Sequence, residues 1–276
     1  MRTVTAHMTA GHGGSVEAPL VLIHGATSSA SVWGPVLPKL GTQRHVLTPT
    51  LAGHRGGPSL TAGPQGVVTR IVDQMCRQLD EYRVDQAHLV GNSLGGWVAL
   101  ELARRKRARS VLALSPAGAW RSPRDLRRLL GRFRGASALA RIKKAPDLLA
   151  NGRLRRVMLR AMAEHAERMT PEQILAAFED LAGCAALADI LNGARANGPI
   201  EPLSEPGCRV RILWSLHDRM LPFMRYGASM LQAVPGAEFA FLPGVGHVPM
   251  IDDPDLVAAS ILDFIAAVED PSPPAF

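Results

Sequence analysis

The chain has 276 residues, of which 47% are hydrophobic and 20% are charged. This composition excludes a largely disordered chain, and the length suits one large α/β domain with an insertion. No apolar run approaches the ~20 residues that cross a bilayer, and the N-terminus lacks the apolar region of a secretory signal. We therefore expect a cytoplasmic protein without stable membrane insertion.

The cysteines and histidines give no metal-binding pattern. Cys76, Cys184 and Cys208 are widely separated and form no CxxC pair, which favours reduced thiols packed as small apolar groups. The nine histidines contain no HExxH pair. The sequence therefore predicts no metal site.

Strand and helix patterns alternate from the N-terminus to Pro116. Leu20–Ile23 is a continuous apolar run, typical of a strand that a parallel sheet buries on both faces. The pattern predicts further strands at 1–9, 46–47, 87–90 and 110–114, and helices near 32–40, over 67–79 and from 94 to 105. This alternation indicates a doubly wound, mostly parallel α/β sheet flanked by helices.

From Trp120 to about Asn197 only helical periodicity is present. Its clearest apolar stripe is Leu126, Leu129, Leu130 and Phe133, and Thr170-Pro171 is typical of a helix start. The alternation then resumes, with strands at 210–214 and 238–242, helices near 223–232 and 254–268, and a tail at 271–274 that we expect to fray. We predict a core formed by 1–118 and 206–276, interrupted by an all-helical cap over 119–205.

Residues 91–96, Gly-Asn-Ser-Leu-Gly-Gly, carry the strongest chemical signal. They match G-x-S-x-G at a point where a strand ends and a helix begins. Such a nucleophile elbow holds its serine on a strained turn and projects the hydroxyl from the edge of the sheet. Ser93 is therefore the predicted nucleophile.

A serine hydroxyl needs a base, and the base needs an acid that orients it. His247 comes late in the chain, in a loop after the predicted strand 238–242, and is the predicted base. Asp218 follows the predicted strand 210–214 and lies between Ser93 and His247 in chain order, so it is the predicted acid.

The tetrahedral intermediate of this chemistry needs hydrogen-bond donors for its oxyanion. The main-chain N–H of Leu94, directly after the nucleophile, is one predicted donor. Ala26, in the loop after the first core strand, supplies the other. Because both donors are main-chain groups, the side chains at these positions are little constrained.

The other histidines and nearby acids are expected to be structural. His24 ends a core strand and is interpreted as a histidine bonded to nearby backbone. Surface or loop positions are expected for His54, His165 and His217. The two acids Asp252 and Asp253 are expected to cap the last helix.

Taken together, these pieces resemble the α/β-hydrolase fold family over nearly the whole chain. The resemblance rests on Leu20–Gly25 with Trp33 downstream, Leu51–Gly56, the elbow at 91–96, Leu213–Pro222 and Gly246–Pro249. It implies a core sheet, a helical cap and hydrolysis without a cofactor. In two respects the chain departs from the family: it is short for the usual opening strand pair, so one strand is expected to be missing, and Ser215 stands where many members carry glycine.

The serine nucleophile sets aside the dehalogenases and epoxide hydrolases of this family, which use aspartate. The leading hypothesis is hydrolysis of a carboxylic ester or lactone through an acyl-enzyme. A carbon–carbon bond hydrolase acting on a diketone is the alternative among enzymes, although Val248 replaces the aromatic residue expected there. An alternative of another class is a ligand-binding receptor-like protein or a pseudoenzyme.

Two features bear on the substrate, which we expect to be a small molecule. A methionine-rich group, Met158, Leu159, Met162 and Met169, either lines a pocket for apolar groups or forms the cap's own core. The net charge of +7 is concentrated between Arg104 and Arg160, which indicates a solvated positive face or the attraction of an anionic substrate rather than a membrane surface. Nucleic acid is not an expected partner, because aromatic residues are few and not interleaved with the arginines.

Overall fold

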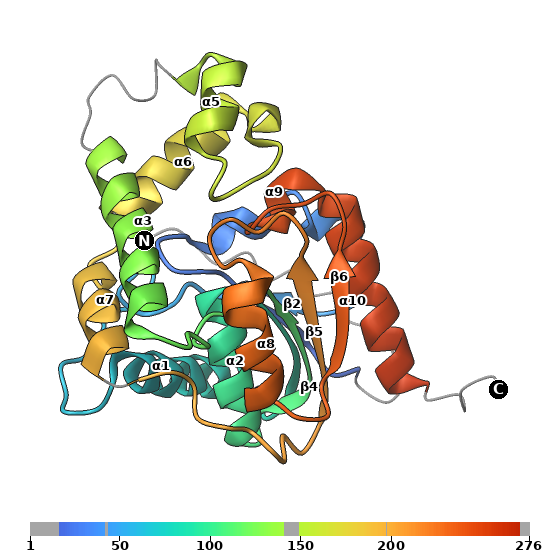
Figure 1. Cartoon of the computed structure of the whole chain (residues 1–276). Coiled ribbons are helices and arrows are strands. Elements are labelled where there is room, and N and C mark those ends of the chain that lie inside the picture. Colours follow the sequence, from blue (N-terminus) through green and yellow to red (C-terminus); the bar gives the residue numbers. More distant parts are fainter. Residues whose placement is uncertain (1–16, 42–43, 141–148, 197, 271–276) are drawn as a thin grey trace.

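The computed structural model describes residues 17–41, 44–140, 149–196 and 198–270 (Figure 1). Its centre is a six-stranded parallel sheet in the order β2-β1-β3-β4-β5-β6. The strands are β1 (Leu20–Ile23), β2 (Val46–Leu47), β3 (Ala87–Asn92), β4 (Ala108–Leu114), β5 (Arg209–Ser215) and β6 (Glu238–Leu242). The chain runs from β1 out to β2 and then returns to β3 on the other side of β1. The winding therefore reverses between β1 and β3, and in open parallel sheets ligands bind beyond the carboxyl ends of the strands at such a point.

Both faces of the sheet are buried, as the apolar run of β1 predicts. Successive strand residues point to opposite faces, so Val21 and Ile23 join one apolar cluster while Leu20 and Leu22 join another. The first face is covered by α1 (Val67–Glu81), α2 (Leu94–Arg104) and α8 (Phe223–Ala233). The second is covered by α10 (Pro254–Glu269) and a short 3-10 helix, η1 (Ala30–Trp33). These layers confirm the predicted fold class (Figure 1).

The helix predicted near 32–40 is wrong. The chain forms two short 3-10 helices there, η1 and η2 (Leu37–Lys39). Pro35 and Pro38 interrupt the segment, and a proline inside a helix removes a backbone donor and clashes with the preceding turn. The other elements differ from the prediction by a few residues at their ends. The predicted strand at 1–9 and the tail at 271–274 lie outside the described residues.

Helices fill the described part of the chain between β4 and β5. They are α3 (Pro123–Ala140), α5 (Gly152–Met158), α6 (Pro171–Ala182) and α7 (Leu187–Ala196), with a 3-10 turn, η3 (Ala166–Arg168). The start of α6 follows from its sequence: the Thr170 hydroxyl accepts from the Gln173 N–H, the Gln173 side chain accepts from the Thr170 N–H, and Pro171 follows. We call these helices the cap; its boundaries at 119 and 205 stay a prediction. Within the residues that the structure describes, no helix is both long and apolar enough to cross a bilayer.

Candidate active site

Ser93 lies on a sharp turn between β3 and α2, at the carboxyl edge of the sheet. Its φ of 56° and ψ of −116° are strained for a residue with a side chain. Three main-chain hydrogen bonds hold the turn: the Ser93 N–H donates to the Leu114 carbonyl (3.0 Å), and the Ser93 carbonyl accepts from Ala117 (2.9 Å) and Trp97 (3.2 Å). The backbone of Ser93 is thus held by its neighbours β4 and α2 in a conformation that it would not adopt alone.

The glycines of the motif permit this turn. A Cβ at Gly91 would collide with the carbonyl of Gly95, and a Cβ at Gly95 would collide with the carbonyl of Ile23 at the end of β1. Both positions therefore exclude side chains, because the elbow, α2 and β1 approach at backbone distance. The spacing of the motif follows from this packing.

Asp218 and His247 meet at the same edge of the sheet, from the loops after β5 and β6. The His247 Nδ1–H donates to Asp218 Oδ2 at 2.7 Å, and both residues are buried. The other carboxylate oxygen of Asp218 accepts from the Leu221 N–H at 2.6 Å. With Nδ1 occupied as a donor, Nε2 of the neutral ring is left as the basic nitrogen.

Asn92 connects the turn at Ser93 to the loop that carries His247. Its buried side-chain amide donates to the His247 carbonyl at 2.9 Å and to the Leu114 carbonyl at 3.1 Å. The side chain of Asn92, which directly precedes Ser93, therefore holds the backbone of His247. Sequence reasoning missed this contact of Asn92, although its place beside the predicted nucleophile was the available signal.

Asp252 does not cap the last helix, contrary to the prediction. Only Asp253 does so, by accepting from the Leu256 N–H at 2.9 Å. Asp252 is buried and accepts three main-chain donors: the N–H groups of Gly246 (2.6 Å), Glu164 (3.0 Å) and His165 (2.6 Å). One carboxylate thus joins the His247 loop to the cap. Its cap partners are 87 and 88 residues away in the chain, so no local pattern could reveal them.

His24 is structural, as expected. Its Nδ1–H donates to the Gly25 carbonyl (2.8 Å), while Nε2 accepts from the Leu51 N–H (3.0 Å). Burial, together with the neighbouring ring of His54, lowers the pKa of His24 to about 3. His54 lies in a loop, as expected, but it is buried, with its ring edge-on to that of His24 and the ring centroids 5.1 Å apart. His165 and His217 are partly exposed loop residues.

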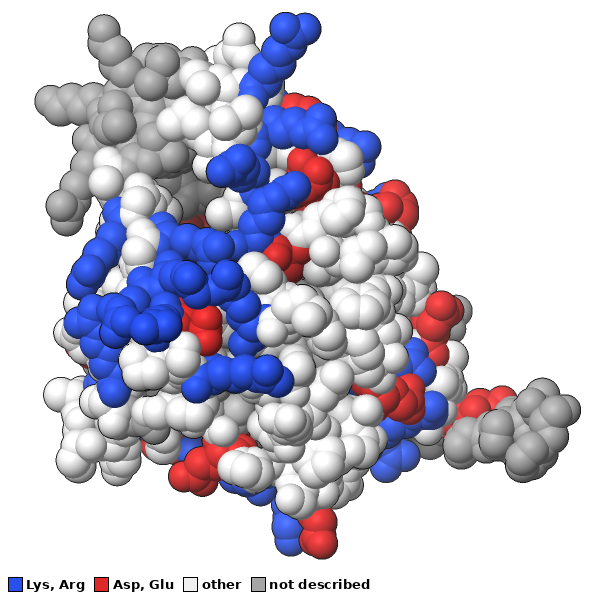
Figure 2. Space-filling model, viewed as in Figure 1, with Lys and Arg blue, Asp and Glu red and all other residues white. Residues whose placement is uncertain are grey.

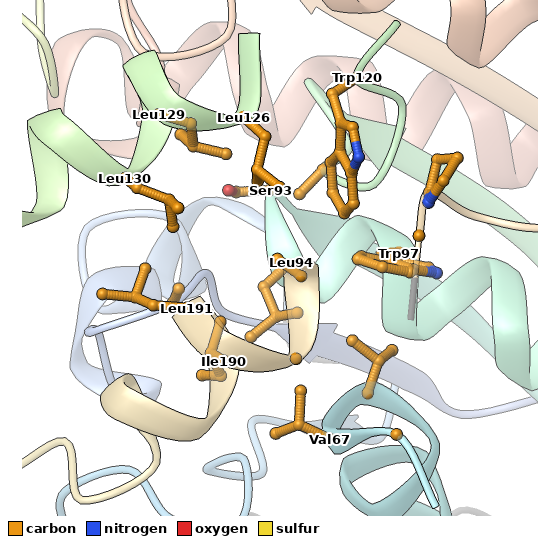
Figure 3. Close-up of a pocket in the computed structure, with 18 of the residues that line it drawn as sticks. Val67, Ser93, Leu94, Trp97, Trp120, Leu126, Leu129, Leu130, Ile190 and Leu191 are labelled. Atoms are coloured by element: carbon orange, nitrogen blue, oxygen red, sulfur yellow. The ribbon is translucent and has the colours of Figure 1, made fainter. Parts of the chain in front are cut away.

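A pocket of about 410 Å³ opens beside Ser93, between the core and the cap (Figure 3). Ala26 and Leu94 line it together with Ser93, and within the described chain neither of their main-chain N–H groups has a hydrogen-bond partner. The other walls are mostly apolar and come from α1, α2, α3, α7 and the segment after β4: among them are Val67, Trp97, Trp120, Leu126, Leu129, Leu130, Phe133, Ile190 and Leu191. The pocket therefore presents an apolar surface to whatever approaches the Ser93 hydroxyl.

The structure shows where two apolar groups of cap residues lie. The stripe on α3 lines the pocket, as the three leucines labelled in Figure 3 show, and two of its members, Leu129 and Phe133, also pack with the apolar cluster on the first face of the sheet. The methionine-rich group lies elsewhere, because Met158, Leu159, Met162 and Met169 pack with Ala163, Ala166 and Ile174 in the cap's own core. None of the four lines the pocket. Of the two interpretations of these residues, the cap's own core is the one that holds.

Basic side chains gather on one face of the molecule, over α3 and α5 (Figure 2). Arg128 and Arg156 are about half exposed, and Arg132 donates to the Met220 carbonyl. Arg155 is an exception: it is buried, and its guanidinium donates to the carbonyls of Leu149 and Glu167. The surface charge thus comes from the other arginines, while Arg141, Lys143 and Lys144 lie outside the described residues. Among the residues described, no group of three or more His, Cys, Asp or Glu could hold a metal ion.

Comparison with known proteins identifies the family. Residues 20–260 match the model of the alpha/beta hydrolase family, and the chain belongs to it. It is similar to the epoxide hydrolase EphH of Mycobacterium tuberculosis, at 34% identity over 203 residues that cover 71% of this chain and 93% of that protein. The protein is therefore a hydrolase of the α/β-hydrolase fold.

Solved structures agree on the fold. A thermophilic esterase from Thermogutta terrifontis superposes with a TM-score of 0.68 at 21% identity, covering 97% of this chain and 98% of that one. The enol-lactonase from Burkholderia xenovorans LB400 superposes with a TM-score of 0.66 at 22% identity, covering 92% and 93%. At such identities the likeness shows the fold alone.

Proposed function

We propose that the protein is a serine hydrolase that cleaves a carboxylic ester or lactone through an acyl-enzyme on Ser93. The observation that carries the proposal is the 2.7 Å hydrogen bond from His247 to Asp218 at the edge of the sheet where Ser93 stands on its strained turn. Asn92 supports it, because its amide fixes the His247 loop to the residue before Ser93. The three residues follow one another in the chain order Ser, Asp, His that this fold uses.

In the proposed mechanism, His247 Nε2 takes the Ser93 proton while Oγ adds to the substrate carbonyl. Asp218 holds the ring in the tautomer whose Nε2 is free, and it stabilises the imidazolium that forms. The N–H groups of Ala26 and Leu94 donate to the oxyanion. The imidazolium then protonates the leaving oxygen, the bond between that oxygen and the carbonyl carbon breaks, and the acyl group remains as an ester on Ser93. Water, deprotonated by the same nitrogen, hydrolyses that ester and restores the enzyme.

The similarity to an epoxide hydrolase raises ring opening as an alternative. A serine oxygen that opens an epoxide becomes an alkyl ether of the enzyme, and an ether has no carbonyl for water to attack. A carboxylate nucleophile would instead give a hydrolysable ester. Because Ser93 occupies the nucleophile position, we expect esters to be turned over repeatedly. Epoxides should at most alkylate the protein once.

The test compares wild type with Ser93→Ala and with Ser260→Ala, a control on α10 far from the elbow along the chain. We expect wild type and the control to hydrolyse phenyl or p-nitrophenyl esters and to react with a fluorophosphonate probe. Ser93→Ala should lose at least ~10⁴-fold in kcat and all labelling, with unchanged circular dichroism. Labelling that persists in Ser93→Ala would refute the assignment. Turnover of diketones in the absence of ester hydrolysis would favour a carbon–carbon hydrolase, and ligand binding without any turnover would favour a receptor.

A further inference from the structure

The pocket beside Ser93 lacks the positive charge that marks the nearby surface. Of its lining residues only Glu101 and Glu201 are ionisable, and no Lys, Arg or His from the described chain lines it. Glu101 is paired with Arg104 at 3.1 Å, outside the lining. An anionic group that entered would leave water and find no cation among the lining residues, since Arg104 and Arg132 behind them already donate to Glu101 and to the Met220 carbonyl, and this disfavours its entry.

The pocket also lies on one side of the ester bond that would be cleaved at Ser93. Ser93 and the N–H donors of Ala26 and Leu94 line it, whereas His247 and Asp218 do not. In acyl transfer the leaving alcohol takes its proton from the histidine, so it must point toward His247. The group held by the pocket is then the other half of the ester, the acyl group.

Resting on the proposed function, we propose that this pocket is the acyl site and accepts only uncharged apolar acyl groups. Trp97 and Trp120 form one wall, edge to face with their ring centroids 5.9 Å apart. The volume of about 410 Å³ exceeds the ~150 Å³ that holds a benzene ring, so a medium-length chain or an aryl-alkyl group fits. A substrate of this kind carries any negative charge on its alcohol side, outside this pocket.

Three esters of one chain length test the proposal: phenyl octanoate, 4-carboxyphenyl octanoate with its charge on the alcohol side, and the phenyl monoester of octanedioic acid with its charge on the acyl side. We expect kcat/KM for the first two to agree within about fivefold and the third to be at least ~100-fold lower. Equal rates for the second and third esters would overturn the acyl assignment. If none of the three is cleaved, the proposed function fails instead.

A matched pair of variants tests the electrostatic cause. Val68 lines the pocket from the start of α1 and is only half-buried. Val68→Lys adds a cation, and Val68→Met adds similar length without charge. We expect Val68→Lys to raise the kcat/KM ratio of the octanedioate monoester to phenyl octanoate at least tenfold, and Val68→Met to leave that ratio near the wild-type value. Equal ratios in both variants would overturn the electrostatic explanation.

A second inference comes from a buried carboxylate of the cap. Asp180 on α6 is 2% exposed. It accepts from the Ser29 hydroxyl at 2.6 Å and from Arg55 Nε at 2.7 Å. Ser29 and Arg55 follow β1 and β2, so this one cap residue binds two core loops at the edge of the sheet that carries Ser93.

The first of these loops holds a predicted oxyanion donor. Ser29 is three positions after Ala26, and Thr27 between them has a φ of 58°, which is strained for a β-branched residue. A strained loop persists only where its surroundings hold it, and the hydrogen bond from Ser29 to Asp180 is such an anchor. We infer that Asp180 is a positioning residue through which the docked cap fixes the Ala26 N–H.

Asp180→Asn tests this inference, with Glu179→Gln as the matched control, since Glu179 pairs with the same Arg55 but is exposed. Active sites are counted by fluorophosphonate titration. We expect Asp180→Asn to lower kcat ~10–100-fold per active site with KM within about twofold, because an oxyanion donor acts in the transition state. Glu179→Gln should change neither constant, and Ser29→Ala should repeat the kcat loss in milder form. An unchanged kcat per active site with only a lower Tm would show a purely structural role.

Discussion

Asp252→Asn should destabilise the protein much more than the same change at its neighbour, Asp253→Asn. Its Oδ2 accepts from Gly246 and Glu164, and its Oδ1 accepts from His165. An amide keeps one oxygen, for Gly246 and Glu164, and turns an NH₂ group toward the half-buried N–H of His165, which loses its acceptor at a cost of about 1–3 kcal/mol. The other two bonds lose their charge assistance, about 1 kcal/mol each. The free energy of unfolding should therefore fall by about 3–5 kcal/mol.

Urea unfolding followed by circular dichroism measures this change, with Asp253→Asn as control. The neighbouring Asp253 caps α10 through a single bond, and asparagine caps a helix about as well as aspartate, so the control should stay within ~0.5 kcal/mol of wild type. Because Gly246 precedes the proposed base, activity should also fall in Asp252→Asn. Equal unfolding free energies for the two variants would refute the reasoning.

Three further predictions follow from the site and its surroundings. Asp218→Asn should lose ~10⁴-fold in kcat, measured on any ester that wild type cleaves, and a loss below tenfold would contradict its place beside His247. The pKa of His24 is lowered by burial to about 3, so between there and its ordinary value of 6.5 the unfolded chain binds a proton that the folded chain does not. The free energy of unfolding should therefore fall as the pH drops through this range, by ~1.4 kcal/mol per pH unit. In His24→Asn the dependence of this free energy on pH should be smaller by the same amount. Urea titrations at several pH values measure both dependences, and equal ones would contradict the prediction. Finally, kcat/KM for 4-carboxyphenyl octanoate should fall as salt rises from ~10 to ~300 mM, while kcat/KM for phenyl octanoate should not change. The reason is that salt screens the attraction of the basic face over α3 for anions. Equal salt responses of the two esters would rule out such steering.

Local patterns were sufficient to place a strained turn at Ser93 and to predict that Asp218 and His247 lie together. The strand, turn and helix around Ser93 lie within a few residues of one another, and the glycines on either side reflect backbone approach at that turn. Asp218 and His247 follow parallel strands, and the carboxyl ends of parallel strands meet at one edge. Chain order and strand position therefore predicted that Asp218 and His247 lie close together.

Contacts between distant segments could not be found in this way. Asn92, Asp180 and Asp252 are single polar residues, each with a partner at least 88 residues away in the chain. A sequence shows that a carboxylate is present, but not which donors surround it once it is buried. The prolines at 35 and 38, by contrast, were visible signals that weigh against the helix predicted there.

The sequence by itself determined the alternation of strands and helices, the sheet with two buried faces, and the serine on a strained turn, because periodicity and backbone sterics act over a few residues. Only the tertiary structure decided what the cap does. The stripe on α3 and the methionine-rich group are both apolar, yet one faces the pocket and the other fills the cap's own core. The physical reason is that burial of apolar surface is non-directional: an apolar face must be covered, and which segment covers it depends on how the cap folds against the core.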